Sequence, residues 1–361
     1  MGRYILVGAD PMKSPSVHPG GVLTLSIGLI EYAKKQGHTV EVINTLRSGF
    51  DDLSIMLRLE AGWDRAVKLF SALRGGNCNG VIIFSGAGFS FYERILLSSI
   101  CKLFSVKDLF VIVDGWFLEI RDRVFLKRCW VGLLLQIPHK LAASGSRWSN
   151  LFRKLGVRSS HISQIHYWLS ESFVISKNQK TIIPNKPLQF IFVGWMIREK
   201  GLYEILAAIE QLREKYKFTF TFVGGGTLLE DIRQKIRNSG WMEDISALGW
   251  VADEEFQQIL SAADVFVLPS YAEGFPMSLI EALSKGLPAI CTDVGGISDS
   301  LRDGVNGYLI APRQVQPLVE AMERYLQNPH IVTEHSRIAL EVVKTNHTAE
   351  ANCKLAFDAL K

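Results

Sequence analysis

The sequence of 361 residues predicts an α/β protein of two domains, each built on a parallel β-sheet that helices cover on both faces. Three observations predict this fold class: the length, the short strands of consecutive apolar residues, and the helical stretches between them. A chain of this length exceeds one ordinary hydrophobic core and suits two domains of about 150–180 residues each. Strands that are apolar throughout are typical of sheets buried on both faces. Both halves show this pattern, so we expect two Rossmann-like domains.

The first half alternates strands and helices from its start. We expect strands at Tyr4–Val7, Thr39–Ile43, Val81–Phe84 and Phe110–Val113. A glycine-led helix over Gly20–Lys35 follows the first strand, because apolar residues recur there near helical spacing. This half forms the expected N-terminal domain, residues 1–175.

The second half repeats the scheme more regularly. We expect strands at Phe190–Val193, Thr219–Val223, Val265–Leu268 and Ala289–Thr292. Helices are expected at Leu202–Lys215, Leu228–Ser239, Asp253–Ala262, Ser278–Lys285 and Gln316–Gln327. The segment 176–187 holds three lysines, two prolines and few apolar residues, and we interpret it as the interdomain linker. The C-terminal domain then covers 188–344, and 345–361 is a separate last segment.

Composition excludes some protein classes. Apolar residues make up 48% of the chain, yet no apolar run approaches the roughly 18–20 residues that a membrane-spanning helix needs. The N-terminus has no long apolar stretch, so we expect no signal peptide. Five scattered cysteines without metal-ligand spacing predict reduced, buried thiols in a cytoplasmic protein.

Charge divides unevenly along the chain. Residues 1–187 hold 24 Lys and Arg against 13 Asp and Glu, whereas residues 188–361 hold 16 against 23. Residues 121–158 alone carry nine basic groups and one acidic group, mixed with large apolar side chains. This mixture favours a helix lying on an anionic membrane surface, peripheral on the cytoplasmic face, and we expect no nucleic-acid partner. The alternative is a core helix whose charges are merely solvated.

The chemistry concentrates around one loop in the second half. The strand that ends at Leu268 leads into a loop with Gly and Pro, and a helix begins near Ser278. Ligands of open parallel sheets bind outside the carboxyl ends of the strands, and a helix N-terminus there favours an anion. Glu273 precedes the helix and Glu281 lies one turn into it. A carboxylate there can accept hydrogen bonds from two vicinal hydroxyls; the plain alternative is a solvated Glu273 and a Glu281 that only favours the helix dipole.

Five ordered stretches decide between these interpretations. They are FVGWMIREKG (192–201), FVGGGTLLEDI (222–232), LGWVADEEF (248–256), AADVFVLPSYAEGFPMSLIEAL (262–283) and GLPAICTDVGGISDSLRDGVNGYLI (286–310). Over these 120 or so residues the chain resembles the retaining glycosyltransferases of family 4. That resemblance implies the GT-B fold, in which two Rossmann-like domains face each other across a cleft.

The resemblance also implies roles for named residues. The Glu-x7-Glu signature of the family falls on Glu273, beside the donor sugar, and on Glu281, at the nucleotide ribose. Backbone that meets the diphosphate and sugar comes from Gly274, Phe275, Pro276, Met277, Ser278 and Leu279. The segment Leu248–Val251, with Val251 at its end, is similar to the nucleobase slot. Thr345–Lys361 is similar to the terminal helix that crosses back to the N-domain.

Two positions depart from the family pattern. Lys200 matches the diphosphate lysine, but Trp195 stands where the family has an arginine. Arg198, on the same loop, either substitutes for that arginine or is an exposed loop charge. A histidine near the transferred sugar also has no match, and its position corresponds to Asp114. Asp114 either contacts a sugar hydroxyl or forms a turn with Gly115.

Two glycine clusters complete the candidate site. Gly20 and Gly21, before the first helix, resemble the first glycine loop of the family, where backbone approaches a phosphate or an acceptor oxygen. His18 beside them is either a loop residue or a ligand. Gly224, Gly225 and Gly226 resemble a packing turn near the donor rather than a dinucleotide fingerprint.

The expected function is a retaining transfer of a hexosyl-type sugar. The donor is a nucleoside diphosphate sugar, which is a substrate and for which we favour uridine diphosphate; no cofactor is expected. The acceptor is a saccharide, lipid-linked or not, in cell-surface polysaccharide biosynthesis. No metal is implied, because the sequence has no Asp-x-Asp pair on a loop. The alternatives are a sugar-nucleotide epimerase of the same fold and a non-catalytic sugar-nucleotide-binding subunit.

Overall fold

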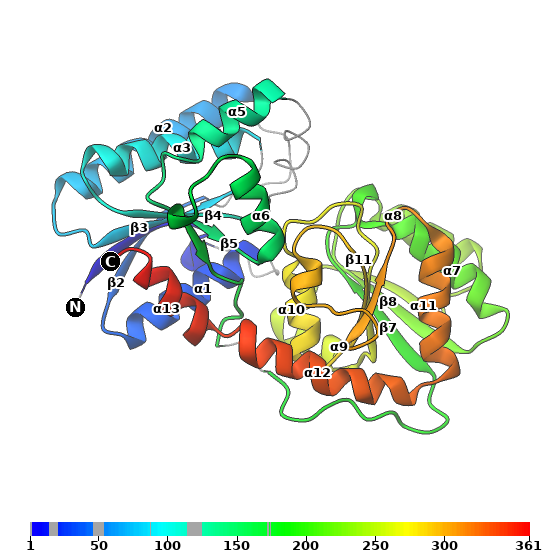
Figure 1. Ribbon diagram of the computed structural model, residues 1–361. Coiled ribbons are helices and arrows are strands. Elements are labelled where there is room, and N and C mark those ends of the chain that lie inside the picture. The colour runs from blue at the N-terminus through cyan, green and yellow to red at the C-terminus, as the bar shows by residue number, and fades with distance from the viewer. Residues whose placement is uncertain are drawn as a thin grey trace. The chain divides into compact units, whose positions relative to one another are not determined.

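The structure is a computed structural model that describes residues 2–13, 21–45, 54–86, 88–113, 125–171, 173 and 175–361. The chain divides into two compact units, which are treated separately below (Figure 1). The N-terminal unit comprises residues 1–15, 19–171 and 347–361. The C-terminal unit comprises residues 16–18 and 172–346.

The N-terminal unit is built on a six-stranded parallel sheet. Its strand order is β2-β1-β3-β4-β5-β6. The strands are β1 (Arg3–Gly8), β2 (Thr39–Asn44), β3 (Gly80–Ser85), β4 (Asp108–Ile112), β5 (Lys140–Ala143) and β6 (Ile162–Gln164). The central strands β3 and β4 are buried at every residue, as a sheet covered on both faces requires.

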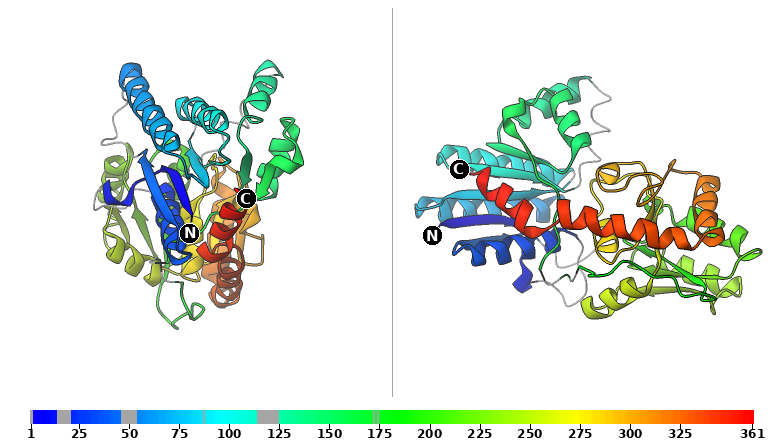
Figure 2. Two further views of the ribbon diagram at one scale, coloured as in Figure 1. Left: turned by 90° about the vertical axis from the view of Figure 1, so that its left-hand side faces the viewer. Right: turned by 60° about the horizontal axis from the view of Figure 1, so that its bottom comes forward.

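Helices cover both faces of this sheet. On one face α1 (Gly21–Lys35) packs against α13 (Ala349–Asp358). On the other face α3 (Phe89–Leu103) lies between α2 (Ile55–Arg74) and α5 (Phe125–Leu134) (Figure 2). The other helical elements in the described part of this unit are η1 (Pro11–Lys13), α6 (Ser146–Lys154) and η2 (Ser159–His161). One core cluster joins the sheet to α2, α3, α5 and α6.

The last segment of the chain belongs to the N-terminal unit. The N–H of Leu169 donates to the carbonyl of His347 at 3.1 Å, and the N–H of His166 donates to Asn352 Oδ1 at 2.9 Å. The ring of Phe357 on α13 packs edge-on against Tyr4 of β1, with centroids 4.7 Å apart. A helix from the end of the chain therefore completes a core that the first strand begins.

The C-terminal unit contains a second six-stranded parallel sheet, in the order β12-β11-β10-β7-β8-β9. The strands are β7 (Leu188–Val193), β8 (Phe218–Val223), β9 (Ile245–Gly249), β10 (Val265–Leu268), β11 (Ala289–Thr292) and β12 (Gly307–Ile310). The helices are η3 (Arg198–Lys200), α7 (Leu202–Arg213), α8 (Leu229–Asn238), α9 (Asp253–Ala262), α10 (Met277–Ser284), η4 (Ile297–Asp299), α11 (Val315–Gln327) and α12 (His330–Asn346).

The predicted α/β class with two parallel sheets is confirmed. Strands β10 and β11 and helix α9 have the predicted bounds. The cysteine expectation is wrong in one respect, because Cys129 is exposed and Cys78 only half-buried, while the other three thiols are buried. In the described part of the chain, no helix combines the length and apolar character needed to cross a bilayer.

Candidate active site

The candidate site lies where the strand order of the C-terminal sheet reverses. From β7 the chain builds outward through β8 and β9, and then returns to β10 on the other side of β7. Ligands of open parallel sheets bind outside the carboxyl ends of the strands at such a switch point. The loops after β7 and β10 carry Lys200 and Glu273, and Lys200 Nζ lies 2.6 Å from Glu273 Oε1. Two of the predicted site residues are therefore in direct contact.

Gly201 allows the two loops to approach each other. Its φ of 71° lies in the left-handed region, and a Cβ at this position would lie 2.2 Å from the carbonyl oxygen of Pro269. Only glycine, which lacks a Cβ, both adopts this left-handed φ without strain and leaves room for the Pro269 carbonyl. The N–H of Tyr271 also donates to the carbonyl of Glu199 at 2.7 Å, which ties the loops together on the same side.

Glu273 is held from several directions. Its side chain is 8% exposed, and Ser270 Oγ donates to the same Oε1 at 2.6 Å. Below it, a Cβ on Gly295 (φ 57°) would lie 2.2 Å from the carbonyl oxygen of Glu273, and the N–H of Gly296 donates to Gly274 at 2.9 Å. The loop after β11 thus supports the loop after β10. A buried carboxylate requires such partners, because an uncompensated charge in this position is costly.

Helix α10 begins beside this ion pair. It starts at Met277 after Pro276, and among the described residues no side chain caps it. Its first N–H groups and its dipole therefore favour an anion at this end. Glu281 is the fifth residue of the helix and is only 2% exposed. The backbone from Gly274 to Leu279 lies in the same buried region, with Ser278 half-buried.

Trp195 occupies the position of the missing family arginine and packs on a second tryptophan. Its ring meets Trp250 edge-on, with centroids 5.1 Å apart, and 38% of the residue stays exposed. A Cβ on Gly225 would lie 2.5 Å from the indole Nε1 of Trp250, so the glycine turn fits against this ring. Val251, half-buried, follows directly. The two tryptophans form an aromatic wall at the carboxyl ends of β7 and β9.

Arg198 lies at the outer rim of the same loops. It is exposed, it opens η3, and its charge acts on Tyr271. Burial raises the pKa of Tyr271 to about 12, the hydrogen bond from its hydroxyl to Glu204 Oε1 (2.7 Å) adds to this, and Arg198 and Arg313 oppose it. The guanidinium of Arg313 stacks 4.5 Å from the centroid of the Tyr271 ring. Arg198 therefore stands within the loop cluster, on the Tyr271 side.

The glycine turn after β8 packs against the loop after β7, as predicted. A Cβ on Gly224 would lie 1.9 Å from the carbonyl oxygen of Gly194, and one on Gly226 would lie 2.6 Å from that of Met196. The N–H of Met196 donates to the carbonyl of Gly225 at 2.8 Å. Backbone thus meets backbone, which leaves no space for side chains at these positions.

The other predicted site residues belong to the first half of the chain. Gly21 opens α1. Gly20, His18 and Asp114 lie outside the described residues. Sequence reasoning did not single out Ser270, whereas Trp250 lies within the predicted segment Leu248–Val251. Ser270 had a detectable signal, since it is a hydroxyl residue two positions past a buried strand and three before Glu273.

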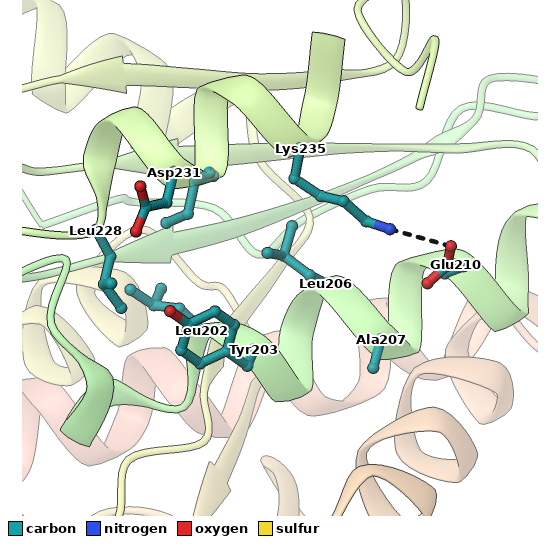
Figure 3. A pocket seen from close by; sticks show the side chains of 9 residues that line it. Leu202, Tyr203, Leu206, Ala207, Glu210, Leu228, Asp231 and Lys235 are labelled. Carbon is teal, nitrogen blue, oxygen red and sulfur yellow. Dashed lines mark hydrogen bonds and ion pairs between the residues drawn. The ribbon is translucent and has the colours of Figure 1, made fainter. Parts of the chain in front are cut away.

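An apolar pocket of about 270 Å³ lies between α7 and α8 (Figure 3). It is lined by Leu202, Tyr203, Leu206, Ala207, Glu210, Leu228, Asp231, Ile232 and Lys235. The ion pair of Lys235 and Glu210, 3.1 Å apart, closes one end. This largely apolar lining, with Asp231 in it, does not suit a diphosphate, so the donor site is not expected here.

The family of the C-terminal unit follows from a match to known sequences. Residues 175–341 match the family model described as glycosyl transferases group 1. This part of the chain is a group 1 glycosyltransferase domain. Lys200, Glu273 and Glu281 all lie within it.

Curated relatives match less than half of the chain. A putative teichuronic acid biosynthesis glycosyltransferase of Bacillus subtilis is 39% identical over 164 residues, which are 45% of this chain and 39% of that protein. The 2-deoxystreptamine glucosyltransferase of Streptomyces kanamyceticus is 30% identical over 151 residues, 42% of this chain and 39% of that protein. The chain covers about two fifths of the length of the curated relatives that it matches.

Solved structures match the whole chain in fold. Sucrose-phosphate synthase from Thermosynechococcus elongatus has a TM-score of 0.78 and 16% identity, and the match covers 98% of this chain and 97% of that one. Anabaena Alr3699/HepE, solved in complex with UDP-glucose, has a TM-score of 0.71 and 15% identity, with 99% of each chain covered. The two six-stranded parallel sheets with their helices match GT-B glycosyltransferase structures, which confirms the predicted fold class.

Proposed function

We propose that this protein is a retaining glycosyltransferase of family 4. It transfers a hexosyl-type sugar from a nucleoside diphosphate sugar to a saccharide acceptor, lipid-linked or not, in cell-surface polysaccharide biosynthesis. The observation that carries the proposal is the contact of Lys200 with Glu273 at the switch point of a group 1 glycosyltransferase domain, beside the N-terminus of α10. Relatives named for teichuronic acid, amylovoran and colanic acid biosynthesis support the polysaccharide assignment.

The donor is proposed to lie along the loops after β7, β9 and β10. Glu281 accepts hydrogen bonds from the ribose hydroxyls, and Glu273 contacts the sugar. The backbone of residues 274–279 meets the diphosphate, and the segment ending at Val251 receives the base. Uridine diphosphate is favoured as the nucleotide, because the neighbour Alr3699/HepE was solved with UDP and with UDP-glucose.

Charge development explains why these groups stand together. When the sugar–phosphate bond breaks, the diphosphate departs with its negative charge and the sugar becomes oxocarbenium-like. Lys200, Arg198 and the N-terminus of α10 are proposed to stabilise the leaving diphosphate. Glu273 fixes the ammonium group of Lys200 before the donor arrives, so that little reorganisation is needed during the reaction.

The N-terminal unit is proposed to bind the acceptor. Gly20 and Gly21 at the start of α1 would approach acceptor or phosphate oxygens, and Asp114 would contact a hydroxyl of the transferred sugar. The basic segment 121–158 is proposed to meet an anionic membrane on the cytoplasmic side. In its described part, Trp130 and Leu133 of α5 are exposed while Val131 is buried, and the Arg128 guanidinium donates to the carbonyl of Lys154.

Incubation of radiolabelled nucleoside diphosphate sugars with the protein and a membrane extract tests the function. Label in a lipid-linked or saccharide product, with the anomeric configuration of the donor, is expected. A water-soluble isomer of the donor would identify an epimerase instead. Binding without turnover would identify a non-catalytic subunit. A thermal-shift panel of nucleotides identifies the base, and we expect UDP to raise the melting temperature most.

A further inference from the structure

Helix α2 exposes an apolar stripe that the core of the N-terminal unit does not use. The stripe consists of Met56 (79% exposed), Leu59 (55%), Trp63 (73%), Val67 (49%) and Phe70 (43%). These positions are three or four residues apart and so follow one side of the helix. A different set faces the core, namely Gly62, Ala66, Leu69 and Leu73. The helix therefore has two apolar faces, and only one of them is buried.

The stripe continues onto the neighbouring helix. Phe70 meets Phe104, which follows α3, edge-on with ring centroids 5.0 Å apart. On α3, Leu96 is 53% exposed and Leu103 is 74% exposed. Helix α3 lies beside α2 on the same face of the sheet (Figure 2). Met56, Leu59, Trp63, Val67, Phe70, Leu96 and Leu103 are called the α2–α3 apolar surface below. Clustered exposure of this kind marks a site of association with a protein or a membrane.

Basic groups accompany this surface. Arg74 and Lys102 occupy the last turns of α2 and α3, at the end where Phe70 and Phe104 join the two helices, and both are exposed. Of the two acidic residues of α2, Asp64 is paired with Lys68 at 2.6 Å and Glu60 is exposed. The surrounding half of the chain, residues 1–187, carries 24 basic against 13 acidic residues. We therefore expect a partner that has both an apolar interior and negatively charged groups.

We propose that the α2–α3 apolar surface inserts into the headgroup region of an anionic lipid bilayer. Trp63 and Phe70 suit the boundary between headgroups and acyl chains, and Arg74 and Lys102 suit the phosphates above it. This surface does not include segment 121–158, for which contact with a membrane was proposed above because of its positive charge. A second copy of the chain fits less well, because a two-fold contact pairs this surface with itself, and the surface offers no excess of negative charge to Arg74 and Lys102.

Vesicle flotation of the full-length protein tests the proposal. The vesicles contain phosphatidylcholine with phosphatidylglycerol, or phosphatidylcholine alone. In the variant Leu59→Gln with Trp63→Gln, partition to anionic vesicles should fall about a hundredfold, since each large side chain contributes roughly a factor of ten. The control is Leu355→Gln on α13, which is 46% exposed on the opposite face of the same unit and should bind as wild type does. Unchanged melting temperatures establish that both variants are folded.

Further measurements separate insertion from its alternatives. The fluorescence that disappears in the variant Trp63→Phe is the part that Trp63 emits. Lipids with brominated acyl chains should quench this part, and such quenching requires contact between Trp63 and the acyl chains. Vesicle binding that persists in the double variant overturns the proposal. The proposal is also overturned if light scattering shows that the wild type is a dimer and the double variant a monomer. The proposal rests on the proposed function in one respect, because a lipid-linked acceptor would give the membrane contact its biological purpose. The double variant should nevertheless retain nucleotide binding. If wild type binds vesicles but no nucleotide, the proposed function fails and the membrane surface stands.

Discussion

The two units have the same architecture but use it differently. In the C-terminal sheet the strand order reverses between β7 and β10, and the loops there bring Lys200 and Glu273 into contact. In the N-terminal sheet it reverses between β1 and β3, and the described loop after β3 holds Gly86 and Gly88 rather than charged groups. The N-terminal unit instead exposes apolar side chains on its covering helices α2 and α3. Among the described residues, the C-terminal unit thus gathers charged groups in its loops, whereas the N-terminal unit exposes apolar groups on its helices.

The largest effect is expected at the ion pair of the C-terminal unit. Glu273→Gln should lower turnover about 10²–10³-fold, because it removes the carboxylate that orients Lys200 and contacts the sugar. Nucleotide affinity should change far less. Steady-state kinetics and calorimetric titration measure the two effects. Glu199→Gln, which changes an exposed carboxylate beside Lys200 on η3, is the control and should act like wild type. Equal losses in turnover and affinity would show that Glu273 does not act at the sugar.

A loss of stability, rather than of turnover, is expected from the backbone that brings the two loops together. Gly201→Ala should destabilise the C-terminal unit by roughly 2–5 kcal/mol, which combines left-handed strain with a clash against Pro269. Gly240→Ala is the matched control, since its φ of 67° is similar but no atom lies within 4 Å of the added Cβ. It should cost about 1–2 kcal/mol. Scanning calorimetry measures both, and equal shifts would show that the approach of the loops is not tight.

Glu281 tests whether the same unit binds the nucleotide. Glu281→Ala should weaken binding of the nucleoside diphosphate by roughly 1.5–3 kcal/mol, because it removes a charged acceptor for the ribose hydroxyls. Isothermal titration checks this, with the exposed Glu254→Ala of α9 as the control. An unchanged dissociation constant in a folded variant would refute the ribose assignment and remove one reason for locating the donor in this unit.

The smallest effect is expected at the rim. Arg198→Ala should raise the dissociation constant of the nucleoside diphosphate about tenfold, as for the loss of one charge-assisted contact, and leave that of the nucleoside unchanged. Arg313→Ala removes the other guanidinium beside Tyr271 and is the matched control. If both variants weaken binding equally, the effect comes from the general positive field and not from a clamp formed by Arg198 with Lys200.

Sequence reasoning succeeded where local pattern decides structure. Strands β10 and β11 are apolar throughout and were predicted with the observed bounds. Strand β5 (KLAA) is short and rich in small residues, and β9 at the sheet edge is half-exposed, so neither gave a clear signal. Helix α2 was missed because its apolar residues occupy two faces rather than one.

The candidate site was predictable as a set of residues but not as a set of contacts. Strand ends and the family resemblance singled out Lys200, Glu273 and Glu281. The contact of Lys200 with Glu273 and that of Trp195 with Trp250 depend on which strands are neighbours and in what register. Trp195 and Trp250 lie more than 50 residues apart in the sequence, and no local pattern predicts contacts of this kind.

The return of the chain to the N-terminal unit has a consequence for protein synthesis. Strands β7–β12 all come from one continuous stretch, so this sheet can form as that stretch leaves the ribosome. The strands of the first sheet are continuous along the chain as well, but the face that α1 covers is completed only by α13, whose Phe357 packs on Tyr4 and Tyr32. At ~5–20 residues per second, the 190 residues from 172 to 361 take roughly 10–40 s to emerge. During that interval Tyr4 and Tyr32 lack the ring of Phe357, so this face of the N-terminal unit stays incompletely covered until α13 has been synthesised.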